Sequence, residues 1–185
     1  MARIAIVTPA RPGARTGNLH TAQRWAAMLR SGGHHVSVAS EWPRDPCDLL
    51  VALHAKRSHA SVLRYRAANP AGPLIVTLTG TDLYRDLPAS AEARASLALA
   101  DRVIVLQEDA KRQLQSAVRR KTRTVYQSAD PRARHAPPAR CFRIAIVGHL
   151  REEKDPFRAV MALAHLPGRN DLEVEIGRAS CRERV

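Results

Sequence analysis

A short basic segment follows the third apolar run of the sequence and could bind an anion. It reads Leu53-His54-Ala55-Lys56-Arg57-Ser58-His59 and places two cations, two imidazoles and a hydroxyl together. Cations such as Lys56 and Arg57 form strong hydrogen bonds with phosphate or carboxylate oxygens. Solvated cations beside an ordinary serine cap are the alternative. His54 and His59 are spaced poorly for sharing a metal on one helix face, so we predict no metal site.

A second polar segment, Thr79-Gly80-Thr81-Asp82-Leu83-Tyr84-Arg85-Asp86, follows the fourth apolar run. The hydroxyl of Thr81 and the carboxylate of Asp82 suit a polyol or sugar. Helix capping by Asp82 is the alternative. The two segments together make His54, Lys56, Arg57, Thr81 and Asp82 candidate ligand-binding residues.

A glycine-containing loop extends from Pro9 to Asn18 and includes Arg15 and Gly17. We expect a helix to begin at its end, where backbone amides and the helix dipole favour an anion. The loop does not match the GxGxxG dinucleotide fingerprint, and Glu41 is the one acidic residue placed to hold a ribose. A nicotinamide-dependent dehydrogenase is therefore disfavoured.

A second such loop runs from Val147 to Pro156. Gly148 lets a ligand approach the backbone, and Arg151 and Lys154 can neutralise a diphosphate.

The elements that position these loops alternate between short Val-, Ile- and Leu-rich runs and longer stretches with helical spacing. This pattern is typical of a doubly wound parallel α/β sheet, in which ligands bind beyond the carboxyl ends of the strands. The expected strands are Arg3–Thr8, His35–Ala39, Asp48–His54, Leu74–Leu78, Arg102–Leu106 and Thr122–Tyr126. The expected helices are Asn18–Ser31, Ser58–Ala68, Ser90–Ala100 and Glu108–Val118.

The pentapeptide Arg-Ile-Ala-Ile-Val occurs twice, at 3–7 and at 143–147, and each copy leads into a glycine-containing loop. A proline-rich stretch, 129–141, precedes the second copy and is expected to be a linker. We therefore predict a first Rossmann-like domain over 1–128 and the start of a second over 142–175, with a helix at Pro156–His165 and a strand near Leu172–Glu175. A doubly wound domain needs about 100 residues, so we expect the second to be incomplete. Residues 176–185 resemble a translated sequencing adapter and are expected to be a non-native tail.

The composition, with 45% apolar and 25% charged residues, is that of a globular protein. The formal net charge of +13 fits either an anion-binding protein or a bias towards arginine. No run is long enough to span a membrane and the three cysteines form no CxxC pair, so we expect a cytoplasmic protein.

Several of these motifs resemble the GT-B glycosyltransferases of family 4. The stretch from Gly17 to Val36 is similar to that family's opening loop and first helix, and 100–105, ADRVIV, resembles one of its strands. Val147-Gly148-His149-Leu150 with Lys154 resembles its phosphate-binding loop, although His149 replaces the usual arginine and Asp155 the usual glycine. Arg151 could compensate for the first departure.

Within family 4, the strings TGTDLYRDLP (79–88) and GHLREEKDP (148–156) resemble those of the selenosugar synthases. The resemblance covers residues 1 to about 175 and implies transfer of an N-acetylhexosamine from a UDP-sugar to selenophosphate, with no cofactor or metal. It implies a donor diphosphate site and an acceptor site, whereas it leaves the catalytic residue unknown. The donor residues would be Gly17, Gly148, His149, Arg151 and Lys154. The acceptor residues would be Arg15, Asn18, His54, Lys56, Arg57, Thr81 and Asp82.

Two alternatives remain at this point. Another family 4 transferase, with a sugar or lipid acceptor, would be favoured by exposed Leu or Phe on the first domain. A basic nucleic-acid-binding module would show steeply salt-dependent DNA binding. Because the acidic motif of the family's donor site is not found in the sequence, the 185-residue chain is expected to be inactive.

Overall fold

The first part of the chain folds around a parallel sheet of six strands. The computed structural model describes residues 1–10, 13, 16–129, 131, 133, 136, 138–148 and 155–177. The chain forms two compact units, Met1–Ala129 (the first unit) and Asp130–Val185 (the second unit). The strands of the first unit are β1 (Arg3–Val7), β2 (His35–Ala39), β3 (Leu49–Leu53), β4 (Leu74–Leu78), β5 (Arg102–Val105) and β6 (Thr122–Thr124). They lie in the order β2-β1-β3-β4-β5-β6, and every neighbouring pair is parallel.

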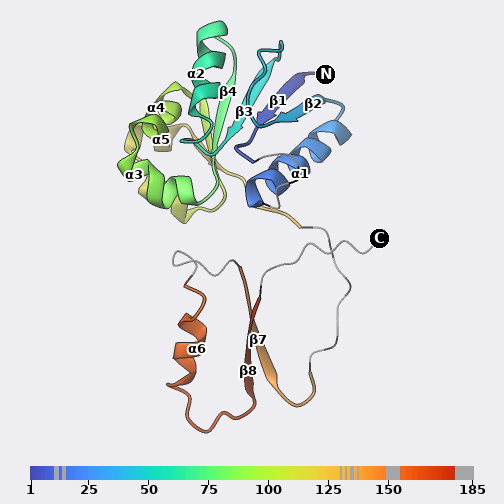
Figure 1. The fold of residues 1–185 in the computed structure, drawn as a ribbon, viewed down its shortest axis with the longest axis vertical. Coiled ribbons are helices and arrows are strands. Elements are labelled where there is room, and N and C mark those ends of the chain that lie inside the picture. Colours follow the sequence, from blue (N-terminus) through green and yellow to red (C-terminus); the bar gives the residue numbers. More distant parts are fainter. Residues whose placement is uncertain are drawn as a thin grey trace. The chain divides into compact units, whose positions relative to one another are not determined.

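Helices cover both faces of this sheet (Figure 1). On one face, α1 (Gly17–Ser31) packs Ala22 and Ala26 against Ile6 of β1 and Leu53 of β3. On the other face lie α2 (His59–Ala68), α4 (Ala91–Leu99) and α5 (Ser116–Arg120). Because both faces are covered, the central strands β1, β3 and β4 are nearly continuous apolar runs. The predicted α/β fold with a parallel sheet is confirmed, and the strand order is consistent with a Rossmann-like domain.

Hydroxyl side chains cap the N-termini of two of these helices. The Thr16 hydroxyl accepts a hydrogen bond from the Leu19 N–H at the start of α1, at 3.4 Å. The Ser90 hydroxyl accepts one from the Ala93 N–H at the start of α4, at 3.2 Å. Each hydroxyl satisfies an amide that has no partner within its helix.

Two segments differ from the sequence-based expectation. The single helix predicted over Glu108–Val118 is wrong: a 3-10 helix, η2 (Asp109–Gln113), and the short helix α5 replace it. The backbone of Leu114 between them is extended, and its side chain is buried in the core. The polar segment after β4, expected to be a loop, forms a π-helix, η1 (Asp82–Asp86), followed by the helical turn α3 (Leu87–Ala89).

The chain beyond β6 returns to α1. The Gln127 amide and the Thr21 hydroxyl are hydrogen-bonded at 3.0 Å, and Arg24 Nε donates to the Ser128 hydroxyl at 2.8 Å. Residues 127–128 are therefore fastened to the helix that follows β1.

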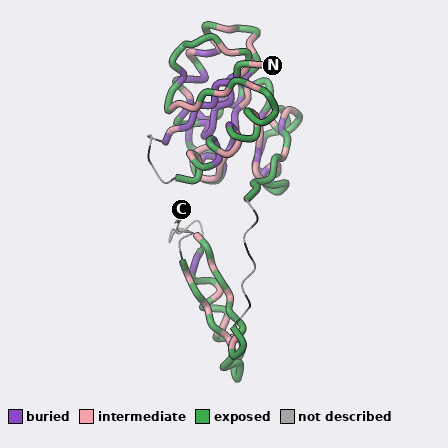
Figure 2. Tube along the Cα trace, turned by 90° about the vertical axis from the view of Figure 1, so that its right-hand side faces the viewer, coloured by how far each residue is buried: buried purple, intermediate pink, exposed green. Residues whose placement is uncertain are grey.

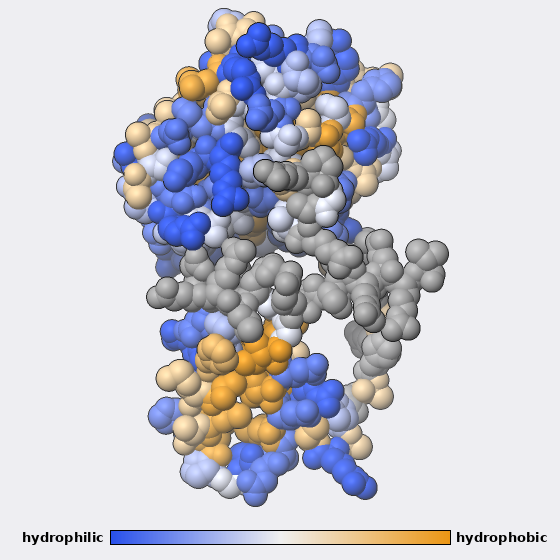
Figure 3. Space-filling model, viewed as in Figure 1, coloured by the Kyte–Doolittle hydropathy of each residue, from blue (hydrophilic) through white to orange (hydrophobic). Residues whose placement is uncertain are grey.

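The second unit is a parallel pair, β7 (Phe142–Val147) and β8 (Leu172–Gly177), with the helix α6 (Arg158–Leu163). Buried residues are concentrated in the first unit (Figure 2). The repeated pentapeptide shows the contrast, because Val7 in β1 is 1% exposed and Val147 in β7 is 68% exposed. In the second unit, apolar side chains gather on the face that Figure 3 shows. Within the described residues, every helix of the protein is too short or too polar to cross a bilayer.

Candidate functional site

The connectivity of the sheet indicates that a ligand would bind at the carboxyl ends of the strands (the carboxyl edge). The chain leaves β1 through α1 towards β2 on one side, whereas it leaves β3 through α2 towards β4 on the other. Open α/β sheets generally bind ligands beyond the carboxyl ends of the strands at such a divergence, which here lies between β1 and β3. The turn after β3 and the segment after β4 meet at this edge, where the Ala55 N–H donates to the Asp82 carboxylate.

The turn after β3 carries two exposed cations on a backbone that buried side chains hold in place. His54 has a φ of 74°, in the left-handed region that few residues other than glycine adopt. Its Nδ1 accepts a hydrogen bond from the Arg57 N–H at 3.3 Å, and the Ser58 hydroxyl donates to the Leu53 carbonyl at 2.6 Å. His54 and Ser58 are buried, while Lys56 and Arg57 are exposed. The buried residues thus fix the backbone of the turn, from which the side chains of Lys56 and Arg57 extend.

Asp82 joins this turn to the loop after β4. One of its carboxylate oxygens accepts the Ala55 N–H at 3.2 Å. The other accepts the N–H groups of Thr79 at 2.8 Å and Gly80 at 2.9 Å. The side chain is fully buried, and burial raises the pKa of Asp82 above its usual range, against these three amide bonds. In this structure Asp82 positions the two loops and offers no oxygen at the surface.

A second carboxylate, Asp86, lies beneath the same turn. Its Oδ2 is 3.6 Å from Nε2 of His54, beyond hydrogen-bond distance, and this buried nitrogen has no partner among the described residues. Because Nδ1 accepts a hydrogen bond, the proton of the neutral imidazole is on Nε2. Burial lowers the pKa of His54, so the ring is neutral at pH 7. Asp86 was not among the predicted site residues, although its position one helical turn after Asp82 was a signal.

The structure brings part of the predicted set together. His54, Lys56, Arg57 and Asp82 lie in the two loops that Asp82 joins, and Thr81 directly precedes η1. Gly17 and Asn18 are the first two residues of α1, which follows the loop after β1.

The remaining predicted residues are not brought to this edge by anything that the structure shows. Gly148 follows β7 in the second unit. Arg15, His149, Arg151 and Lys154 lie outside the described residues.

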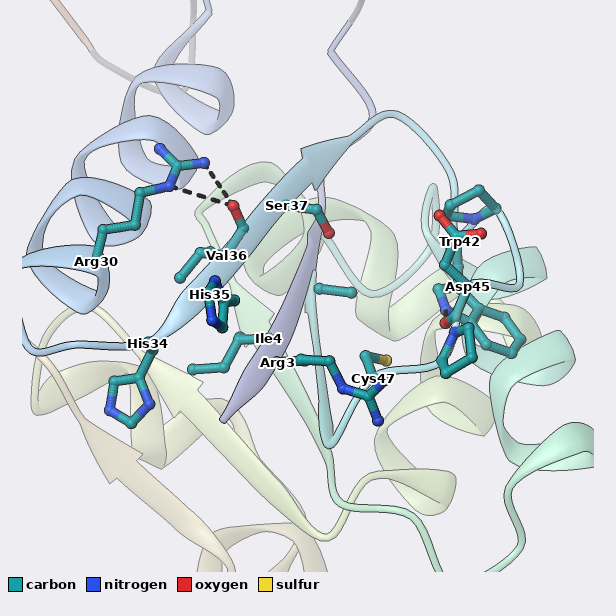
Figure 4. A pocket seen from close by; sticks show the side chains of 13 residues that line it. Arg3, Ile4, Arg30, His34, His35, Val36, Ser37, Trp42, Asp45 and Cys47 are labelled. Atoms are coloured by element: carbon teal, nitrogen blue, oxygen red, sulfur yellow. Dashed lines mark hydrogen bonds between the residues drawn. The ribbon is translucent and has the colours of Figure 1, made fainter. Parts of the chain in front are cut away.

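A separate pocket of about 440 Å³ lies near the amino ends of β1 and β2 (Figure 4). Its cations already have partners: Arg3 is paired with Asp48 at 3.3 Å, and Arg30 donates to the Val36 carbonyl at 2.6 Å. Burial raises the pKa of the Cys47 thiol in this pocket, which disfavours the nucleophilic thiolate. This pocket lies at the amino ends of the strands, opposite to the carboxyl edge, and is the weaker candidate for a ligand site.

Among the described residues, no three metal-ligating side chains gather in one place. No protein-family model matches the chain. No curated protein matches it either. The function of the chain therefore has to be inferred from its residues and from the geometry of the carboxyl edge.

Proposed function

We propose that the chain contains the acceptor side and the start of the donor side of a cytoplasmic GT-B glycosyltransferase of family 4. The enzyme would transfer an N-acetylhexosamine from its UDP-sugar to selenophosphate, as the resemblance to selenosugar synthases implies. The observation that supports this most is the turn of Lys56 and Arg57. These two exposed cations lie at the carboxyl edge, and the buried side chain of His54 accepts a hydrogen bond from the backbone of the turn. A small polyanion suits such a turn.

The chemistry needs little from the acceptor side beyond orientation. The selenium atom forms a bond to the anomeric carbon, and the bond from that carbon to the oxygen of UDP breaks, so the electron pair leaves with UDP. Selenium in selenophosphate is itself a strong nucleophile, and the proposal needs no protein base. Lys56 and Arg57 would hold the oxygens of selenophosphate and fix the direction of attack.

The resemblance to family 4 implies that the donor diphosphate is held by Gly17, Gly148, His149, Arg151 and Lys154. Cations there would stabilise the charge that develops on UDP as it leaves. The described end of the loop after β7 supports the comparison with family 4: Asp155, which stands where the family has glycine, has a φ of 42°. Glycine favours this left-handed region, and aspartate is among the residues that tolerate it.

The test is selenophosphate-dependent release of UDP from UDP-N-acetylglucosamine, using the product of the natural gene read beyond the codon for Glu175. We expect release only with selenophosphate, and a large loss in the double variant Lys56→Ala, Arg57→Ala. Arg102→Ala is the matched control, because Arg102 is an exposed cation at the start of β5, at the opposite edge of the sheet. Release that is indifferent to selenophosphate, or to the double variant, would contradict the proposal. The 185-residue chain is expected to bind selenophosphate without turnover.

A further inference from the structure

An apolar groove of about 850 Å³ lies on the side of the first unit that carries α4 and α5. Its lining comes from η1, α3, α4, η2 and α5. Leu83, Leu97 and Leu114 line it and are 4%, 2% and 3% exposed, so they form its floor rather than its rim. The volume is in the range of sites for single small molecules, whereas protein partners generally cover broad and flatter surfaces.

Two cations line the groove, Arg94 of α4 and Lys121 after α5, and none of the described residues that line it is acidic. Arg94 donates to the Pro88 carbonyl at 2.9 Å, and Lys121 donates to the Ala100 carbonyl at 2.5 Å. These hydrogen-bond partners are neutral, and the nearby Asp101 carboxylate offsets part of the charge of Lys121. An anion at the groove would still gain from the two cations. Burial lowers the pKa of Lys121, as expected for an ammonium group that is partly removed from water.

We propose that this groove binds a single-chain anionic lipid. The alkyl chain lies over Leu83, Leu97 and Leu114, and a phosphate or carboxylate head lies beside Arg94 and Lys121. An apolar floor with a cationic margin matches both halves of such a molecule, whereas a neutral lipid or a free anion would match only one.

This site is distinct from the anion turn at the carboxyl edge, since neither Lys56 nor Arg57 lines the groove. The groove and the turn are nevertheless connected through η1. This π-helix carries Leu83 in the groove, and Asp82 and Asp86 beneath the turn. Lipid binding at the groove is independent of the proposed glycosyltransferase activity.

The experiment is calorimetric titration of the 185-residue chain with dodecyl phosphate below its micelle concentration, with dodecyl maltoside and inorganic phosphate as comparison ligands. Dodecyl phosphate should bind at least about tenfold more tightly than either, because only it uses both the leucine floor and the cations. Equal binding of the neutral dodecyl maltoside would overturn the proposal. Absence of dodecyl phosphate binding would also overturn it.

Two tryptophan substitutions locate the binding. Ala98→Trp fills the groove from the exposed surface of α4 and should weaken dodecyl phosphate binding at least about tenfold. Ala27→Trp is the matched control at an exposed position of α1, on the other face of the sheet, and should leave binding unchanged. Equal affinities of the two variants, once both show the wild-type melting temperature, would contradict the assignment.

The cationic margin is tested by Lys121→Met, which keeps much of the side-chain volume. It should lower the affinity for dodecyl phosphate and leave the weaker binding of dodecyl maltoside unchanged. Binding of an acidic amphipathic peptide in preference to dodecyl phosphate would replace the lipid with a protein partner and refute the proposal.

Discussion

Replacing Asp82 by alanine removes the acceptor for three backbone N–H groups, those of Ala55, Thr79 and Gly80. A hydrogen bond to a charged group contributes about 1.5–3 kcal/mol, and a buried donor left without a partner costs about 1–3 kcal/mol. The Ala55 amide is buried, whereas water can reach the other two amides more easily. The expected loss of unfolding free energy is therefore about 3–5 kcal/mol rather than the full sum.

Asp82→Asn separates the charge from the geometry. The amide oxygen can still accept from Thr79 and Gly80, but its NH2 group would face the Ala55 N–H, donor against donor. We expect a loss of about 1–3 kcal/mol, less than for alanine.

Urea unfolding followed by tryptophan fluorescence measures both variants, because Trp25 and Trp42 are the two tryptophans of the sequence and both lie in the first unit. Asp109→Ala is the control: its carboxylate pairs with Arg112 at 3.1 Å on the surface, and its removal should cost less than about 1 kcal/mol. A cost for Asp82→Ala no larger than for Asp109→Ala would refute the assignment of Asp82 as the residue that joins the two loops.

Two further predictions concern stability. Because the folded-state pKa of His54 lies below its ordinary value of 6.5, the unfolded chain binds more protons there, and stability should fall as pH drops below that value. His54→Asn tolerates the left-handed backbone and should reduce this loss between ~pH 7 and ~pH 5; an unchanged pH profile of the melting temperature would contradict the reasoning. Gly72→Ala should cost about 1–3 kcal/mol, since the new Cβ would lie 2.8 Å from Cβ of Asn69 and 2.7 Å from the Tyr65 hydroxyl. Gly17→Ala, where a Cβ meets nothing within 4 Å, should change stability by less than about 1 kcal/mol, and a larger loss there than at Gly72 would refute the steric argument.

Much of the fold follows from hydrophobic periodicity. The apolar runs at 3–7, 49–53 and 74–78 could be identified as buried parallel strands because the pattern depends on local sequence alone. The helix predicted over Glu108–Val118 shows where periodicity fails. Ala110, Leu114 and Val118 have helical spacing and no Gly or Pro interrupts them, but Leu114 reaches the core with an extended backbone. Tertiary packing decides such a break, and local propensity does not encode it.

The site shows the same division. The sequence places Lys56, Arg57 and Asp82 in loops at the carboxyl ends of strands, and the structure brings these loops together. The sequence alone could not show that Asp82 accepts a hydrogen bond from the Ala55 N–H, because that contact depends on how the loops after β3 and β4 meet in space. The burial of His54 near Asp86 is equally non-local.

Binding of selenophosphate at the turn of Lys56 and Arg57 is measured most directly by an NMR titration of the amide-labelled 185-residue chain. We expect the largest shifts at the amides of Lys56, Arg57 and Ser58, and we expect these shifts to saturate with ligand and to disappear in the double variant Lys56→Ala, Arg57→Ala. The largest shifts at His35 and Cys47 in the pocket at the opposite edge, or no saturable shift anywhere, would contradict it.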